Sequence, residues 1–420
     1  MTATDTHRAI EAVWRIESAR LIAGLARIVR DVGLAEELAQ DALVAALEQW
    51  PESGVPDNPG AWLMATAKHR AIDQLRRGKL LERKHEELGR ELEAQEMAVP
   101  DVESAMDDHV GDDLLRLMFI ACHPVLSTES RVALTLRLLG GLTTDEIARA
   151  YLVAEPTIAQ RIVRAKRTLA DAHIPFELPR REELDARLSS VLEVIYLIFN
   201  EGYSATAGDD WIRPELCEDA LRLGRILAEL MPNESEVHGL VALMEIQASR
   251  SAARIGPSGE PVLLLDQDRA RWDQLLIHRG LAALDRARAL GGTLGPYALQ
   301  ASIAACHARA RTAAETDWPR IASLYEQLAE LTPSPIVELN RGVAVAMAFG
   351  AAAGLEIVDT LTSEPALRGY HLLPSARGEL LAKLGRFDEA HEEFARAASL
   401  TRNARQRELL LKRAAECVAR

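Results

Sequence analysis

The sequence has few cysteines, and none of them has the spacing of a metal site. Cys122, Cys217, Cys306 and Cys417 lie about a hundred residues apart, whereas zinc ligands usually come in closely spaced pairs. The neighbouring histidines do not complete such a set. We therefore expect reduced thiols in or near packed cores, and neither a metal nor a cofactor.

Common catalytic motifs are also missing. There is no P-loop, dinucleotide-binding glycine fingerprint, HExxH motif or nucleophile elbow. Only the stretch NEGYS (200–204) suggests a catalytic cluster, and we interpret its Gly202 as a helix C-cap. The sequence predicts that the protein is not an enzyme.

No apolar run is long enough to cross a membrane. The least charged run, GVAVAMAFGAAAGL (342–355), is shorter than the about 20 residues of a spanning helix. The first 20 residues mix charges with apolar residues, unlike a secretion signal. We expect a cytoplasmic protein that does not enter the membrane.

Alternation at period two is absent, and apolar residues recur at helical spacing along nearly the whole chain. A globular chain of 420 residues is expected to form two or three domains. We predict an all-α protein with two small helical domains, the second a helix-turn-helix, and a C-terminal helical-repeat domain. The predicted boundaries are 8–84, an acidic linker at 85–115, 116–173 and 184–420.

The net charge of −14 has the wrong sign for a general DNA-binding protein, but it averages over opposite patches. Residues 66–84 hold seven Lys and Arg against two acids, and residues 161–167 hold four against none. The linker holds eleven acids against one Arg. Because DNA responds to local patches, the net charge does not exclude DNA binding.

Residues 143–172 have the pattern of a helix-turn-helix. Thr144 can cap the first helix, and Pro156 suits the start of the second. Leu152 stands where the turn usually has a glycine. In the second helix Ile158, Ile162 and Leu169 face inward. The outward positions are Gln160, Arg161, Arg164 and Arg167, whose side chains suit base edges and phosphates.

Residues 36–50 predict an amphipathic helix, followed by a connector at 51–60 and a helix that Asn58 caps and Pro59 opens. Outward positions of the first helix are Glu37, Gln40, Asp41, Val44 and Glu48. In the second helix Thr66, Arg70, Asp73 and Arg77 face outward, and Met64, Ala67, Ala71 and Leu75 face inward. Taken alone, residues 36–50 suit an ordinary bundle helix with solvated carboxylates.

Three stretches together resemble the extracytoplasmic-function group of sigma-70 family RNA polymerase sigma factors. They are ELAQDALVAALEQW, PGAWLMATAKHRAIDQLRR and LTTDEIARAYLVAEPTIAQRIVRAKRTL, in the order of that family and with its acidic connector between them. The resemblance covers about residues 10–173 and implies a promoter-specificity subunit.

The resemblance implies a role for each stretch. The residues that match the helix docking on the β′ clamp of core polymerase are Glu37, Gln40, Asp41 and Glu48. Those that match minus-ten contacts are Asp57 and Asn58, in the loop that captures a flipped base, and Arg70, Arg76 and Arg77. Those that match the minus-thirty-five helix are Thr157, Gln160, Arg161, Arg164, Lys166 and Arg167. The implied partners are promoter DNA in the bacterial nucleoid and core RNA polymerase, through its β′ clamp and β flap.

The last 240 residues contain degenerate helix-pair repeats. Residues 381–416 resemble a tetratricopeptide pattern, weaker copies begin at Trp318 and Arg279, and we expect helix ends near Leu290, Leu331 and Leu400. The sigma factor subgroup with such an extension is thought to use it in place of a separate anti-sigma factor, which implies regulation. Recruitment of a regulatory partner protein by the repeats is the competing interpretation.

A free-standing helix-turn-helix regulator with a sensing or partner-binding repeat domain is the alternative function. Residues 36–77 separate the two interpretations, because such a regulator needs no clamp-binding helix followed by a strand-opening one. We therefore favour the sigma factor.

Overall fold

The computed structural model describes residues 3–87, 110–151, 153–205, 207–208, 212–257 and 260–418. The side chains of 3–5, 77–87, 110 and 207–208 are not described. By their contacts the residues form two compact units, Met1–Val194 and Ile195–Arg420. The predicted boundaries at 8–84, 85–115, 116–173 and 184–420 remain predictions.

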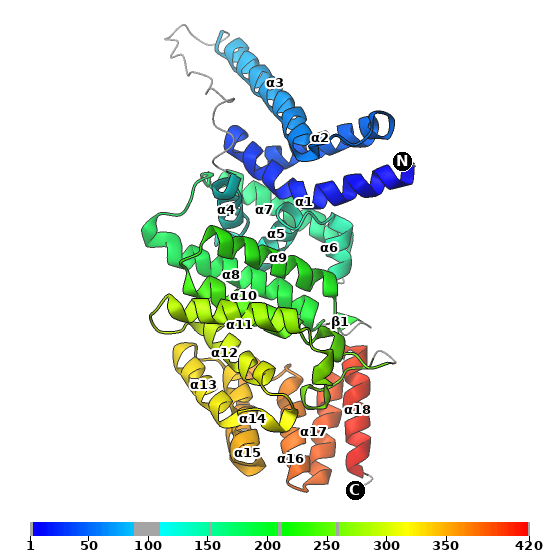
Figure 1. Cartoon of the computed structure of the whole chain (residues 1–420), viewed down its shortest axis with the longest axis vertical. Helices are drawn as coiled ribbons and strands as arrows, with labels where there is room; N and C mark the ends of the chain where they lie inside the picture. Colours follow the sequence, from blue (N-terminus) through cyan, green and yellow to red (C-terminus); the bar gives the residue numbers. More distant parts are fainter. Residues whose placement is uncertain are drawn as a thin grey trace. The chain divides into compact units, whose positions relative to one another are not determined.

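Unit 1 is helical throughout its described part (Figure 1). Its helices are α1 (Ala3–Val29), α2 (Val32–Ser53), α3 (Pro59–Glu87), α4 (Val110–Ala121), α5 (Thr128–Leu138), α6 (Thr144–Ala150), α7 (Glu155–Asp171) and the first part of α8 (Arg181–Tyr203). Helix α1 packs against α2, α3 and α4, and α7 packs against α5 and α6.

Small residues bring the helices of unit 1 close together. On α2, Ala35, Ala39, Ala42 and Ala46 are buried, and Trp50 closes this row. The Trp50 ring meets Trp62 of α3 edge to face, with 5.3 Å between ring centroids. Apolar burial of this kind provides most of the stabilisation of a helical domain.

Unit 2 continues from α8 as a series of helices. They are α9 (Pro214–Leu230), α10 (Ser235–Ala248), α11 (Gln274–Ala289), α12 (Pro296–Arg309), α13 (Trp318–Leu331), α14 (Pro335–Phe349), α15 (Ala351–Thr360), α16 (Leu372–Lys383), α17 (Phe387–Leu400) and α18 (Ala404–Val418). Short 3-10 turns lie at Ser251–Ala253, Leu264–Asp266, Arg269–Arg271, Ala313–Glu315, Leu361–Ser363 and Pro365–Leu367. Two-residue strands β1 (Ala207–Gly208) and β2 (Arg402–Asn403) pair in parallel.

Successive helices of unit 2 pack against one another (Figure 1). The three helix ends expected from the repeats are confirmed: Leu290 caps the C-terminus of α11, and α13 and α17 end at Leu331 and Leu400. The all-α fold class is also confirmed. None of the described helices combines the length and the apolar character that a membrane span requires.

All four cysteines are free thiols, and all but Cys306 are buried. Burial raises the pKa of Cys122 to about 11, and its sulfur lies 3.4 Å from Thr135 Oγ1. Burial likewise raises the pKa of Cys217 to about 12. Within the described ranges, no group of His, Cys, Asp and Glu is arranged to hold a metal ion.

The prediction that Gly202 is a helix C-cap was wrong. Gly202 lies inside the last turn of α8, and its carbonyl accepts a hydrogen bond from Arg213 N at 2.7 Å. A Cβ there would lie 2.6 Å from Cys217 N and 2.9 Å from Arg213 O. The glycine is therefore needed because the start of α9 approaches α8 closely.

We expect Gly202→Ala to lower the free energy of unfolding of unit 2. Overpacking costs about 1–3 kcal/mol, more than the up to about 1 kcal/mol that alanine gains over glycine in a helix, and backbone atoms cannot swing aside. Urea denaturation of the full chain measures the change. Gly369→Ala is the control, because its Cβ would meet no described atom within 4 Å. Equal stabilities of the two variants would contradict this account.

Candidate functional site

One face of α2 carries the acidic residues that the sequence assigned to polymerase binding. Glu37, Asp41 and Glu48 are exposed, and Gln40 is half-buried. The Asp31 side chain begins the helix by accepting a hydrogen bond from Leu34 N at 2.7 Å. The face is thus an acidic surface on a helix whose opposite side is anchored in the core.

The same surface continues onto α3 through an ion pair. Asp41 Oδ2 lies 3.7 Å from Arg70 Nη1, and both side chains are substantially exposed. Exposed pairs of this kind contribute little stability. Both groups therefore remain available to a partner.

The connector between α2 and α3 is shorter than predicted. Helix α2 continues through Pro51 to Ser53, and Gly54, at φ 82°, ends it, which leaves 54–58 as the loop. Asp57 is exposed. Asn58 caps α3 as predicted, with its Oδ1 accepting from Ala61 N at 3.1 Å.

The basic residues predicted on α3 are described only in part. Arg70 is half-buried and Arg76 is exposed, whereas the Arg77 side chain lies outside the described residues. Leu75 was predicted to face inward, but it is 39% exposed. This prediction was wrong because the buried stripe of Leu63, Ala67 and Ala71 ends one turn earlier.

The first helix of the helix-turn-helix begins one residue earlier than predicted. Thr143, not Thr144, is the N-cap of α6, since its hydroxyl accepts from Glu146 N at 3.1 Å. Glu146 Oε2 in turn accepts from Thr143 N at 2.8 Å. This reciprocal capping box satisfies two backbone donors at once. Leu152, in the predicted turn, lies outside the described residues.

Helix α7 separates an apolar from a polar face as predicted. Ile158, Ile162 and Leu169 are buried, and Pro156 lies in the first turn. Of the predicted minus-thirty-five residues, Thr157, Gln160, Arg164 and Arg167 are exposed and Arg161 is half-buried. The polar face thus presents guanidinium and amide groups suited to base edges and phosphates.

Lys166 differs from these neighbours because Glu36 of α2 holds it. Lys166 Nζ pairs with Glu36 Oε2, and Arg137 Nε of α5 donates to Glu36 Oε1 at 2.6 Å. Gln40 Nε2 donates to the same oxygen at 2.6 Å. Sequence reasoning missed Glu36, which is 3% exposed, because its cationic partners are distant in the chain.

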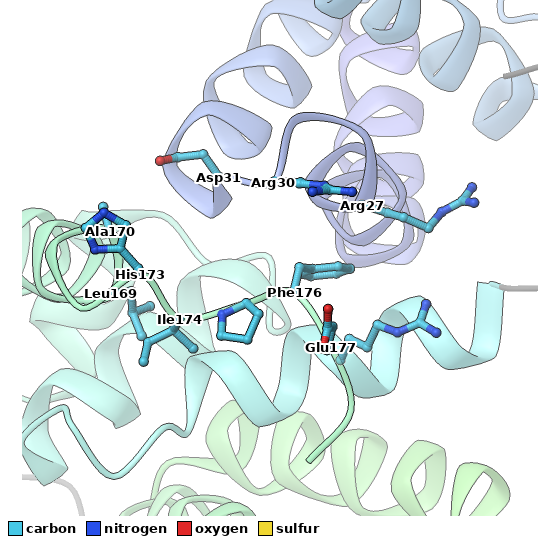
Figure 2. Close-up of a pocket in the computed structure, with 11 residues that line it drawn as sticks. Arg27, Arg30, Asp31, Leu169, Ala170, His173, Ile174, Phe176 and Glu177 are labelled. Atoms are coloured by element: carbon cyan, nitrogen blue, oxygen red, sulfur yellow. The ribbon is translucent and has the colours of Figure 1, made fainter. Parts of the chain in front are cut away.

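A cavity of about 700 Å³ opens within unit 1, between the α1–α2 junction and the end of α7. Its lining includes Arg27, Arg30 and Asp31 at the α1–α2 junction, and the segment Ile174–Glu177 (Figure 2). Figure 2 shows that segment crossing beneath the junction. Close packing is therefore incomplete where the end of α7 meets α1 and α2.

Comparison with protein families finds three matches along the chain. Sigma-70 region 2 matches residues 16–80, and Sigma-70, region 4 matches residues 116–169. A family of unknown function, DUF6596, matches residues 187–288. The first two matches contain α2, most of α3, α6 and most of α7.

Several relatives are similar to the chain over different lengths. An uncharacterized protein of Rhizobium meliloti (strain 1021), R00370, is 44% identical over 382 residues, which cover 90% of this chain and 89% of that protein. The probable ECF RNA polymerase sigma factor SigI of Mycobacterium tuberculosis is 26% identical over 168 residues, 40% of this chain and 57% of SigI. The ECF RNA polymerase sigma factor SigK of Mycobacterium sp. (strain KMS) is 27% identical over 162 residues, 37% of this chain and 77% of SigK.

We expect Thr143→Ala to destabilise α6 by about 1 kcal/mol, the usual cost of losing an N-cap hydroxyl. Thr144→Ala is the matched control, with an expected change below about 0.5 kcal/mol, because Thr144 is not the capping residue. Amide hydrogen exchange in α6 reports the free energy of local opening. A larger effect at Thr144 would overturn the assignment of the cap.

Proposed function

Because the chain belongs to the extracytoplasmic-function group of the sigma-70 family and carries a C-terminal extension, we propose that its exposed side chains divide the work of promoter-specific initiation. In this proposal α2 docks on core RNA polymerase, the 54–58 loop and α3 engage the minus-ten element, and α7 reads the minus-thirty-five element. The extension regulates the process. The chain supplies binding and no catalytic step.

The observation that carries the proposal is the exposed polar faces of α2 and α7 inside the two matched sigma-70 regions. Glu37, Asp41 and Glu48 present negative charge on a rigid helix, which suits a basic helical surface such as the β′ clamp. Charge complementarity of this kind steers association and selects the partner.

On the DNA side, α7 offers both kinds of contact that sequence recognition needs. Gln160 suits the paired donor and acceptor of adenine, and Arg161 and Arg164 suit the two acceptors of guanine in the major groove. Arg167, near the helix end, suits a phosphate. The β flap is the proposed polymerase partner of the region around α7.

For the minus-ten element we propose that Asp57 and the loop backbone receive an unstacked base while Arg70 and Arg76 hold the adjacent strand. Asn58 contributes by fixing the start of α3, because its side chain is already engaged as the cap. Unstacking costs a few kcal/mol per base, so contacts that hold the unstacked base favour its capture.

The extension is proposed to regulate access of these surfaces to their partners. Residues 181–420 hold 34 acids against 27 bases, so the extension is acidic where the DNA-facing patches are basic. A partner protein that binds the helix pairs would then change the access of these surfaces to polymerase and promoter DNA in the bacterial nucleoid.

Charge reversal on α2 tests the docking surface. We expect Asp41→Lys and Glu48→Lys each to weaken binding of the full chain to bacterial core RNA polymerase by at least about tenfold, since each places positive charge against a basic partner. Fluorescence anisotropy of the labelled chain measures the affinity. Glu11→Lys, exposed on α1, controls for net charge. Unchanged affinity in the two α2 variants would refute this docking surface.

Truncation tests the extension, and the structure indicates where to cut. A cut after Ala172 would remove Arg187 Nη2, which donates to Phe119 O at 2.8 Å, and Ser190 Oγ, which donates to Cys122 O at 2.6 Å. A cut after Tyr203 keeps both. The promoters are first mapped by immunoprecipitation of the full chain. We then expect the rate of transcription from them to differ at least about fivefold between this shorter chain and the full chain. Equal activity would exclude regulation by the removed part.

A further inference from the structure

We propose that Glu36 competes with DNA phosphate for Lys166 and so holds α7 against α2 until the chain engages a promoter. This inference rests on the proposed function, because it takes α7 as the DNA-reading helix. Glu36 then acts as an internal substitute for a phosphate.

The contacts of Glu36 are those of a built anion site. One oxygen accepts from Arg137 Nε and Gln40 Nε2, both at 2.6 Å, and the other pairs with Lys166. The Glu36 side chain is 4% exposed, whereas those of Arg137 and Lys166 are each 21% exposed. The carboxylate is thus fixed in the interior, and the two cations reach it from the solvent side.

Lys166 cannot serve Glu36 and DNA at the same time. Its ammonium carries one charge on a flexible stem, and the stem lies against α2, because a Cβ on Gly33 would be 3.6 Å from Lys166 Cδ. A phosphate contact gains its affinity from neutralised charge and released counterions. While Glu36 neutralises Lys166, that gain is lost.

The separation of the two promoter elements also requires α7 to leave α2. Glu36, which holds Lys166 of α7, and Ser53, at the end of α2 beside the 54–58 loop, are about 26 Å apart along the helix at about 1.5 Å per residue. The minus-ten and minus-thirty-five elements are about 25 base pairs apart, or about 85 Å of straight duplex at about 3.4 Å per pair. One chain in this arrangement cannot reach both.

The contact between α7 and α2 is polar, but release of α7 together with α4, α5 and α6 also requires α1 to part from α4. Helix α1 packs against α4, and Arg27 Nε lies 2.9 Å from Asp113 Oδ2. Helix α7 packs mainly on α5 and α6, and its apolar residues are buried on that side. The cavity between the α1–α2 junction and the end of α7 leaves this part of the contact loosely filled. Arg15 and Glu146, paired at 3.0 Å, add a contact between α1 and α6 that remains partly exposed to water.

Removing the negative charge of Glu36 tests directly whether it competes with DNA phosphate for Lys166. The probe is a fluorescein-labelled 30-base-pair duplex of arbitrary sequence, titrated with the full-length chain at a series of KCl concentrations. We expect Glu36→Gln to bind at least about fivefold more tightly than wild type at low salt. Its plot of log affinity against log salt should be steeper by about one, the change expected for one more phosphate contact.

Glu11→Gln makes the same change in net charge at an exposed position on α1. It should leave the salt slope unchanged. If Glu36→Gln and Glu11→Gln behave alike, Glu36 does not compete for Lys166 and the proposal fails. In complex with core polymerase bound to its promoter, where α7 is already released, Glu36→Gln should gain less than twofold, and an equal gain there would also contradict the proposal.

If circular dichroism shows that Glu36→Gln does not fold, a second variant tests the same ion pair. Lys166→Gln breaks the same pair from its more exposed side, so amide hydrogen exchange should speed up in residues 32–40 of α2 while the DNA salt slope does not rise. Unchanged exchange would mean that the Glu36–Lys166 pair does not hold α7 against α2. Binding of wild type to core polymerase is measured in parallel, so that its absence reports failure of the proposed function and not of the ion pair.

Discussion

A carboxylate that is removed from water needs compensating charge, because its desolvation costs several kcal/mol even in a real protein. Glu36 meets this constraint with two cations from the second half of unit 1. Arg137 also donates to Leu142 O at 3.1 Å, just before α6. One buried group on α2 therefore holds side chains of both α5 and α7. This charged contact adds to the packing of α1 on α4 where the two matched sigma-70 regions meet.

The parts of this structure that follow from local sequence could be predicted from it. Helical periodicity correctly assigned Ile158 and Ile162 to the buried face of α7, because positions three to four apart share one side of a helix. The Asn58 cap is equally local. Even the misplaced cap of α6 was decidable, since only Thr143 has a glutamate three residues later and can close a capping box.

The remaining features depend on contacts between distant parts of the chain. The sequence around Glu36 does not predict that it is buried, because both cations that compensate its charge belong to other helices. Gly202 fits the local pattern of a helix end, but a glycine is required there because Cys217 of α9 approaches α8 closely. Lys166 has the same spacing as the other basic residues of α7, and only the fold distinguishes it from them.

Burial of the thiols has a consequence for their reactivity. Thiolate, not thiol, reacts with peroxides and disulfides, and with a pKa of about 11 only about one Cys122 side chain in ten thousand is ionised at neutral pH. Cys217, with its higher pKa, is still less reactive. Burial therefore protects these two thiols from oxidants, which act on the thiolate form.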